Sequence, residues 1–137
     1  MKKVVFVCFS FFSFFLVTVS GFASGFERFP FEAPPAPEII IPRSDEVDLT
    51  GKDSLECKWI SLKPAEVDHF ELKLYKGYNM YESGLMFSEN APSDKNFLLI
   101  KAETFEQGQV YTICLRQISY GGEKSDKAFV SFKIIGK

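Results

Sequence analysis

Few side chains in the sequence have the chemistry of a catalytic or metal-binding group. His69 is the only histidine in the chain, and it stands between Asp68 and Phe70. A catalytic triad needs a nucleophile and an acid around the imidazole, and no nucleophile-elbow sequence occurs. A zinc site needs several nitrogen or sulfur ligands, which the chain does not offer nearby. We therefore expect His69 to lie at the rim of the fold without a catalytic role.

Acidic residues gather in one short stretch, at Asp45, Glu46, Asp48 and Asp53. Calcium prefers oxygen-rich loops of this kind, but the EF-hand spacing is absent. Charges beside an edge strand commonly prevent pairing with other chains, which is the favoured interpretation here, with calcium binding as the alternative. Glycine-rich phosphate loops and opposed catalytic carboxylates are also absent. The sequence thus predicts a non-enzyme without a catalytic residue, a cofactor or a metal ion.

The start of the chain has the order of a secretory signal peptide. Lys2 and Lys3 precede an almost wholly apolar run at residues 4–19, and small residues follow. Cleavage is expected after Ala23, with Gly21 as the alternative site, so residues 1–23 would be removed. An uncleaved membrane anchor is less favoured because the run is shorter than the roughly 20 residues that span a bilayer. We expect a secreted, periplasmic or cell-envelope protein, attached to a membrane only if the segment stays uncleaved.

The remaining chain is acidic. Without Lys2 and Lys3, fourteen basic residues stand against eighteen acidic ones, which gives a net charge of −4. Nucleic acid and anionic lipid both favour a basic surface, so neither is expected as a partner. The acidity is spread along the chain and is interpreted as a contribution to solubility.

The mature chain divides into a lead-in and one domain. Residues 24–37 hold four prolines and three phenylalanines, which predicts an extended segment rather than a helix. Residues 38–137 alternate apolar and polar side chains in short runs separated by turn residues. Strands are expected at residues 39–41, 55–60, 70–75, 97–100, 111–116 and 129–134, with 47–49 as a continuation of the first edge strand. Residues 78–87 indicate a kinked strand or a small hairpin, and residues 88–96 a loop.

Two motifs resemble those of fibronectin type III domains. An early strand holds Leu55-x-x-x-Trp59, and a later turn holds Phe105-x-x-Gly108-x-x-Tyr111, which runs into an alternating strand. A proline-rich entry precedes both motifs, and an aromatic-led strand lies between them. In the family the turn is typically Leu-x-x-Gly-x-x-Tyr, so phenylalanine here replaces leucine.

The resemblance implies an immunoglobulin-like β-sandwich with fibronectin type III topology over residues 38–137. Such a domain is all-β and has about seven antiparallel strands. In the family the hydroxyl of the corner tyrosine bonds to nearby backbone, which implies the same for Tyr111. We expect Trp59 and Tyr111 to be buried in one core, on facing sheets.

The two cysteines of the mature chain are Cys57 and Cys114. The resemblance places them on strands two and six, where antibody-type domains carry a disulfide, and exported proteins often form one. In those domains the cysteine follows the corner tyrosine by two residues, whereas Cys114 follows Tyr111 by three and therefore points outward. Since Cys57 points inward, we expect two free thiols, with Cys114 exposed and able to pair with another chain. A β-bulge near Cys114 would instead restore the pairing.

Four residues are candidates for partner binding: Tyr75, Arg116, Tyr120 and Phe129. Tyr75, Arg116 and Phe129 alternate outward on their strands, and Tyr120 belongs to a predicted turn. Exposed aromatic residues with arginine are typical anchors of protein interfaces. The competing interpretation is that these are ordinary solvated strand faces.

The function expected from these features is that of an exported, non-enzymatic interaction or spacer module. Its partner would be another protein or a component of the cell envelope. The alternative is a carbohydrate-binding accessory domain, which needs a flat row of exposed aromatics. Tyr75, Tyr78 and Tyr81 are the candidates for such a row.

Overall fold

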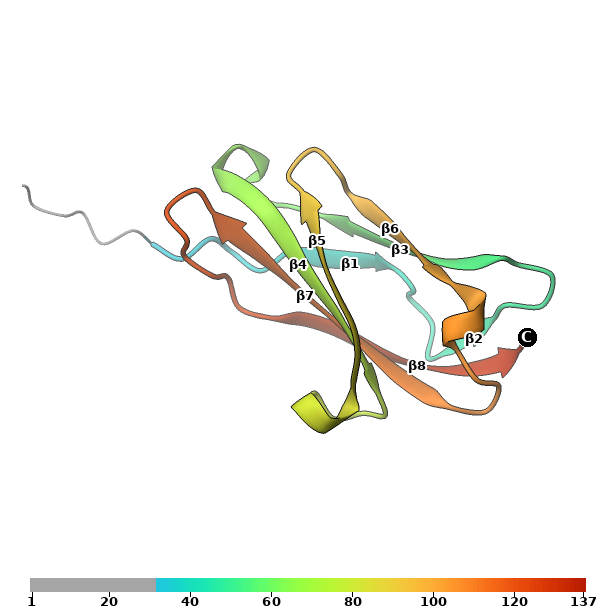
Figure 1. Cartoon of the computed structure of the whole chain (residues 1–137). Coiled ribbons are helices and arrows are strands. Elements are labelled where there is room, and N and C mark those ends of the chain that lie inside the picture. Colours follow the sequence, from blue (N-terminus) through green and yellow to red (C-terminus); the bar gives the residue numbers. More distant parts are fainter. Residues whose placement is uncertain (1–31) are drawn as a thin grey trace, which may run out of the picture.

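The computed structural model describes residues 32–137, which form a two-layered β-sandwich (Figure 1). Its elements in chain order are β1 (Glu38–Ile41), β2 (Glu46–Asp48), β3 (Ser54–Ile60), η1 (Pro64–Glu66), β4 (Val67–Lys76), η2 (Glu82–Gly84), β5 (Leu85–Pro92), β6 (Phe97–Lys101), η3 (Ala102–Thr104), β7 (Val110–Ser119) and β8 (Ala128–Gly136). The predicted all-β fold in two sheets is confirmed. The predicted signal peptide and the three phenylalanines of the lead-in lie outside the described residues.

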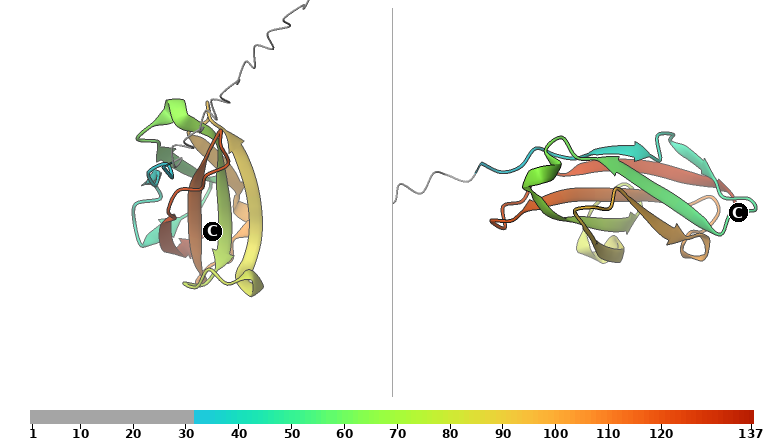
Figure 2. Two further views of the ribbon diagram at one scale, coloured as in Figure 1. Left: turned by 90° about the vertical axis from the view of Figure 1, so that its left-hand side faces the viewer. Right: turned by 90° about the horizontal axis from the view of Figure 1, so that it is seen from above.

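The strands form a three-stranded sheet in the order β1-β3-β6 and a five-stranded sheet in the order β2-β8-β7-β4-β5. Figure 2 shows the two sheets as separate layers when the molecule is viewed from its end. All paired strands are antiparallel except β2 and β8, which run parallel. The described part of the chain thus has eight strands, where the sequence predicted about seven antiparallel ones.

The additional strand arises where the chain changes sheets. β1 ends at Ile41, and the nitrogen of the following Pro42 has no hydrogen to donate to a neighbouring strand. The chain then crosses to the other sheet, where Val47 lies opposite Ile134 and packs against the core. The prediction that residues 47–49 continue the edge of residues 39–41 was therefore wrong, because apolar alternation does not tell which sheet a strand joins.

The segment that was hardest to assign from sequence forms the edge strand β5. It pairs with β4 along Leu85–Pro92, so the loop predicted for residues 88–96 is shorter than expected. Ser88, Glu89 and Asn90 are polar and exposed, so the sequence does not alternate between apolar and polar residues here. Phe87 and Ala91 nevertheless pack against the core. A polar edge strand of this kind has too few apolar positions to be recognised from its pattern.

The space between the sheets is filled by a core that contains both Trp59 and Tyr111. Both side chains are fully buried, Trp59 from β3 of one sheet and Tyr111 from β7 of the other. The ring of Phe105 packs edge-on against Tyr111 with centroids 5.0 Å apart, and Trp59 lies 5.3 Å from Phe70. The prediction of one shared core on facing sheets is confirmed.

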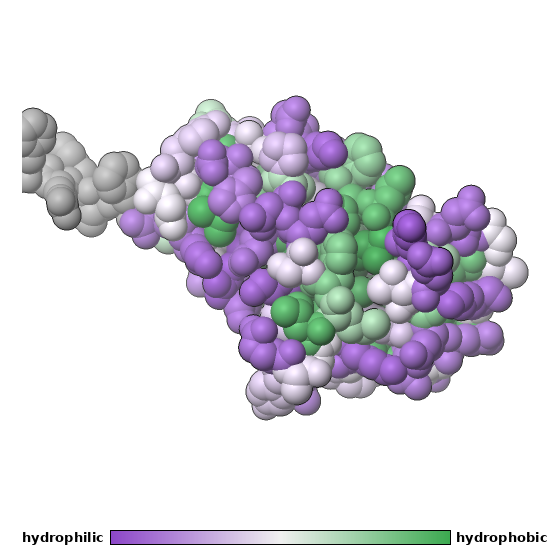
Figure 3. Space-filling model, viewed as in Figure 1, coloured by the Kyte–Doolittle hydropathy of each residue, from purple (hydrophilic) through white to green (hydrophobic). Residues whose placement is uncertain are grey.

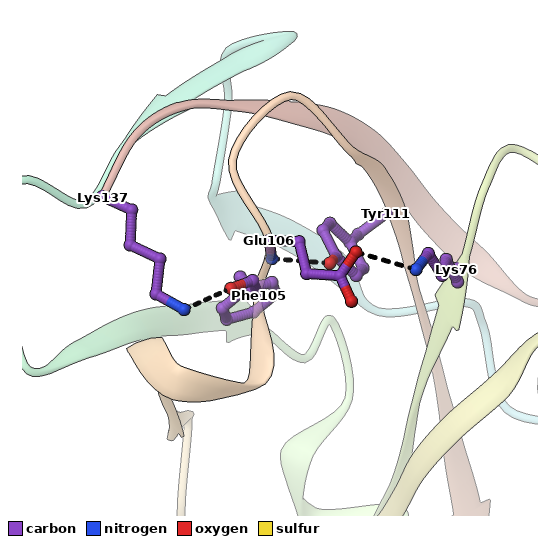
Figure 4. Close-up of polar contacts among 5 residues, drawn as sticks. All are labelled: Lys76, Phe105, Glu106, Tyr111 and Lys137. Carbon is purple, nitrogen blue, oxygen red and sulfur yellow. Dashed lines mark hydrogen bonds and ion pairs between the residues drawn. The ribbon is translucent and has the colours of Figure 1, made fainter.

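The turn before β7 is closed by the hydroxyl of Tyr111. The backbone N–H of Glu106 donates a hydrogen bond of 2.8 Å to Tyr111 Oη (Figure 4). Gly108 has a positive φ of 80°, a conformation that residues with a Cβ adopt rarely. Lys76 Nζ lies 3.0 Å from Glu106 Oε2, and Lys137 Nζ donates to the carbonyl oxygen of Phe105. The hydroxyl bond that the resemblance implied is present.

The described end of the lead-in is attached to the domain. Pro34 and Pro37 are buried, and the carbonyl oxygen of Pro35 accepts a hydrogen bond from Nε2 of buried Gln117. Oε1 of the same Gln117 side chain accepts a 2.8 Å hydrogen bond from Ser61 Oγ. The proline segment next to β1 is therefore part of the folded unit.

Candidate functional site

Three of the four predicted site residues lie on the outer face of the five-stranded sheet. The inward side chains of β4, β7 and β8 fill the core, so Tyr75, Arg116 and Phe129 point away from it. The register places Cys114 between Lys73 on β4 and Phe129 on β8. We call this outward surface of β4, β7 and β8 the five-stranded face. The sequence pattern located it correctly.

Tyr75 is not an exposed anchor, although it points away from the core. Its side chain is only 4% exposed, which corrects the expectation of an accessible ring. On β7 beside it, Thr112 is also buried; its hydroxyl donates a 2.7 Å hydrogen bond to the carbonyl of Gly77 and lies 2.7 Å from Ser131 Oγ. The segment that follows β4 therefore packs close to the sheet at this point. Burial raises the pKa of the Tyr75 hydroxyl, so the group stays neutral.

A hollow of about 230 Å³ lies beside Tyr75 on this face. Its lining carries three basic and two acidic side chains together with Tyr75, Met80 and Cys114; the charged residues are Lys73, Arg116, Lys127, Glu71 and Glu82. An ion pair of 3.7 Å joins Lys73 Nζ to Glu71 Oε1. The Nε atom of Arg116 is buried and has no hydrogen-bond partner among residues 32–137. The hollow thus offers a net positive charge and an unused donor.

Cys114 lines this hollow. Neither it nor Cys57 is bonded to another cysteine, which confirms the prediction of no disulfide between them. Cys114 is buried, however, so the expectation of an exposed thiol was wrong. Burial raises the pKa of Cys114, although nearby Lys127 and Arg116 act in the opposite direction. A thiol held protonated is a poor nucleophile, so the geometry favours a packing role.

Tyr120 lies apart from the other candidates. It is 70% exposed on the turn that follows β7, where Gly122 N donates a hydrogen bond to Ser119 O. Phe129 is 62% exposed and lines a second hollow, of about 430 Å³, together with Tyr78. The expected exposure of Tyr120 and Phe129 is confirmed, but only Phe129 belongs to the five-stranded face.

His69 and the acidic stretch have local structural roles. Nδ1 of His69 lies 2.8 Å from Asp68 Oδ2 on the partly exposed start of β4. Oδ1 of Asp48 accepts a 2.9 Å hydrogen bond from the backbone of Thr50, and bonds to Thr50 lower the pKa of Asp48. Within residues 32–137, no three histidine, cysteine or acidic side chains are grouped so as to hold a metal ion. The helices in the same range are too short to cross a membrane.

Sequence reasoning missed several residues of the hollow. Glu71 and Lys73 could have been found, because they share the outward parity of Tyr75 on β4. Met80 and Lys127 could not, because each lies outside the strands, where no periodicity gives a direction.

Comparisons with known proteins establish the fold only. No family model and no curated protein sequence matches the chain. A solved structure described as "Myokine structure" is similar, with a TM-score of 0.53 and 19% sequence identity. The match covers 75% of this chain and 99% of that one. At this level of identity the likeness supports a β-sandwich and carries no information about function.

Proposed function

We propose that the protein is an exported, non-enzymatic interaction module of the fibronectin type III type that binds another protein through its five-stranded face. The division into sheets of three and five strands and the corner formed by Phe105, Gly108 and Tyr111 support the family assignment. A fold of this type does not define a partner, so the function rests on the surface.

The observation that carries the proposal is the exposed ring of Phe129 next to the charged hollow. Phe129 lies opposite Cys114 in the β7–β8 register, and Cys114 lines the hollow together with Arg116 and Lys127. Aromatic and arginine side chains supply a disproportionate share of the binding free energy in protein interfaces. The excess of basic groups in the hollow favours a partner that presents a carboxylate beside an apolar side chain.

The alternative, a carbohydrate-binding accessory domain, has weaker support. It needs a row of exposed aromatic rings, and Tyr75 is buried. Tyr78 and Tyr81 are exposed, so two rings remain for stacking on a sugar. A glycan array probed with the wild-type protein tests this alternative: binding that is lost in Tyr78→Ala but kept in Phe129→Ser would favour it over the protein partner.

The proposal is tested by affinity capture from the cell-envelope and extracellular fractions of the source. Wild-type protein is compared with Phe129→Ser, Arg116→Ala and, as a matched surface control, Leu62→Ser, which removes an exposed apolar side chain elsewhere. We expect one or more proteins to be captured by the wild type and the control, and lost with both variants of the five-stranded face. Identical captures by all four baits would contradict the proposal.

Export itself is tested by sequencing the N-terminus of protein recovered outside the producing cell. A start at Ser24 or Phe22 is the expected result, because small residues follow the apolar run. An intact Met1 would favour an uncleaved anchor.

A further inference from the structure

The outer face of the three-stranded sheet carries exposed apolar side chains. Phe97 and Leu99 alternate outward on β6 and are 43% and 58% exposed, and Ile60 at the end of β3 is half exposed. Figure 3 views this sheet from the side and shows hydrophobic surface running from β6 toward β5 at the edge of the sandwich, whereas hydrophilic side chains cover much of β4 and β7. Contiguous apolar surface of this kind commonly marks an interaction site.

One acidic and one basic side chain lie directly beside these apolar residues. On β3, Glu56 is opposite Leu99 and Lys58 is opposite Phe97, and all four side chains point outward. Neither Glu56 nor Lys58 takes part in an ion pair within residues 32–137. The backbone positions of the four residues form a rectangle of about 5 by 7 Å, with a carboxylate and an ammonium at neighbouring corners.

We infer that this face binds a second copy of the same chain. The pattern is complementary to itself under a two-fold axis that crosses the strands between Glu56 and Lys58. Such an axis places β3 over β3 of the other copy with opposite direction, so each Glu56 meets the other copy's Lys58. It also places each Leu99 on the other copy's Phe97, which buries both apolar side chains at the centre.

The space around Leu99 fits this arrangement. Leu99 lines two hollows, of about 640 and 460 Å³, that share Lys52 and Ser54 as lining residues. A ring that enters from the other copy can therefore be accommodated without displacing the sheet. The contact involves only a few residues on each side, so its area lies at the low end for specific interfaces. For a small contact of this kind we expect weak association, with a dissociation constant between about 10 µM and 1 mM.

Charge exchange tests the geometry. Sedimentation equilibrium of protein purified from an exporting host, at concentrations up to about 1 mM, should show dimers of the wild type. Glu56→Lys or Lys58→Glu should each raise the dissociation constant about tenfold, because two attractive pairs become two repulsive ones. The double variant Glu56→Lys with Lys58→Glu should restore wild-type affinity, and an equimolar mixture of the two single variants should form mixed dimers.

Apolar truncation and a matched control complete the test. Leu99→Ser should abolish the dimer, whereas Phe129→Ser, an exposed apolar residue on the opposite face, should leave it unchanged. The proposal is overturned if the wild type stays monomeric at 1 mM, if the double charge variant fails to recover association, or if Phe129→Ser dissolves the dimer. It does not rest on the proposed partner site, because the two surfaces belong to different sheets.

Discussion

The core between the sheets and the five-stranded face each contain one buried tyrosine and one buried cysteine. Tyr111 and Cys57 belong to the core cluster and are 0% exposed, while Tyr75 and Cys114 lie outside it and are 4% exposed. The core pair is enclosed between the two sheets, and Tyr111 Oη also accepts a hydrogen bond from the backbone of Glu106. The outer pair lies on the outward side of one sheet, where both side chains line the hollow together with Lys73, Arg116 and Lys127.

Side chains are therefore buried for two different physical reasons in this protein. In the core, sheet packing encloses the side chain, and access requires separation of the sheets. On the five-stranded face, the neighbours are flexible charged side chains and the segment that follows β4, so access requires only local displacement of these groups. A small difference in the exposed fraction can therefore accompany a large difference in protection and in the contribution to stability.

The largest expected effect is that of removing the core tryptophan. Trp59→Ala should lower the free energy of unfolding by about 3–5 kcal/mol, because the deleted ring leaves a cavity between the sheets. That is a large share of the roughly 5–15 kcal/mol that a small domain has in total. The matched control is Phe129→Ala, which deletes an exposed ring and should cost less than about 0.5 kcal/mol. Denaturant unfolding curves measure both, and a wild-type curve for Trp59→Ala would mean that the core assignment is wrong.

A smaller effect separates the two buried tyrosines. Tyr111→Phe removes the acceptor of the Glu106 N–H bond and should cost about 1–2 kcal/mol. Tyr75→Phe keeps the ring and removes a hydroxyl for which the described residues provide no hydrogen bond, so its cost should stay below about 0.5 kcal/mol. The same unfolding curves decide the order.

Tyr120→Ala serves as the control for tyrosine deletion at an exposed turn. Its expected cost is also below about 0.5 kcal/mol, because the ring is exposed. Equal losses for Tyr111→Phe and Tyr75→Phe would contradict the distinction between the core and the five-stranded face.

The sequence predicts well whether a strand side chain points toward the core or away from it, and predicts its exposed fraction less well. Alternation over residues 70–75, 111–116 and 129–134 correctly assigns side chains to the core or to the outside, because strand geometry determines it. At the start of β4 it fails, because a register shift between Val67 and His69 places both Val67 and Phe70 in the core. Exposure depends in addition on what lies over the sheet. Met80 and Lys127, which line the hollow together with Cys114, come from segments without a period, so no pattern could have placed them.

The order and pairing of the strands are also only partly predictable from the sequence. The core motif around Trp59 and the corner at Tyr111 could be recognised because each depends on residues close together in the chain. The parallel pairing of β2 with β8 depends on residues almost ninety positions apart, such as Val47 and Ile134. This pairing depends on which sheet has a free edge, and the local sequence does not indicate which sheet that is.

Thiol modification of the native protein tests the contrast between the two buried regions most directly. Burial raises the pKa of Cys57 to about 12, and the sheets must separate before a reagent can reach it. The wild-type protein is treated with a maleimide at pH 8, and peptide mass spectrometry follows each cysteine separately. We expect Cys114 to react at least about a hundredfold faster than Cys57, whose modification should match the rate set by global unfolding. Equal rates, or faster modification of Cys57, would contradict the assignment of Cys57 to the core and of Cys114 to the outward side of a single sheet.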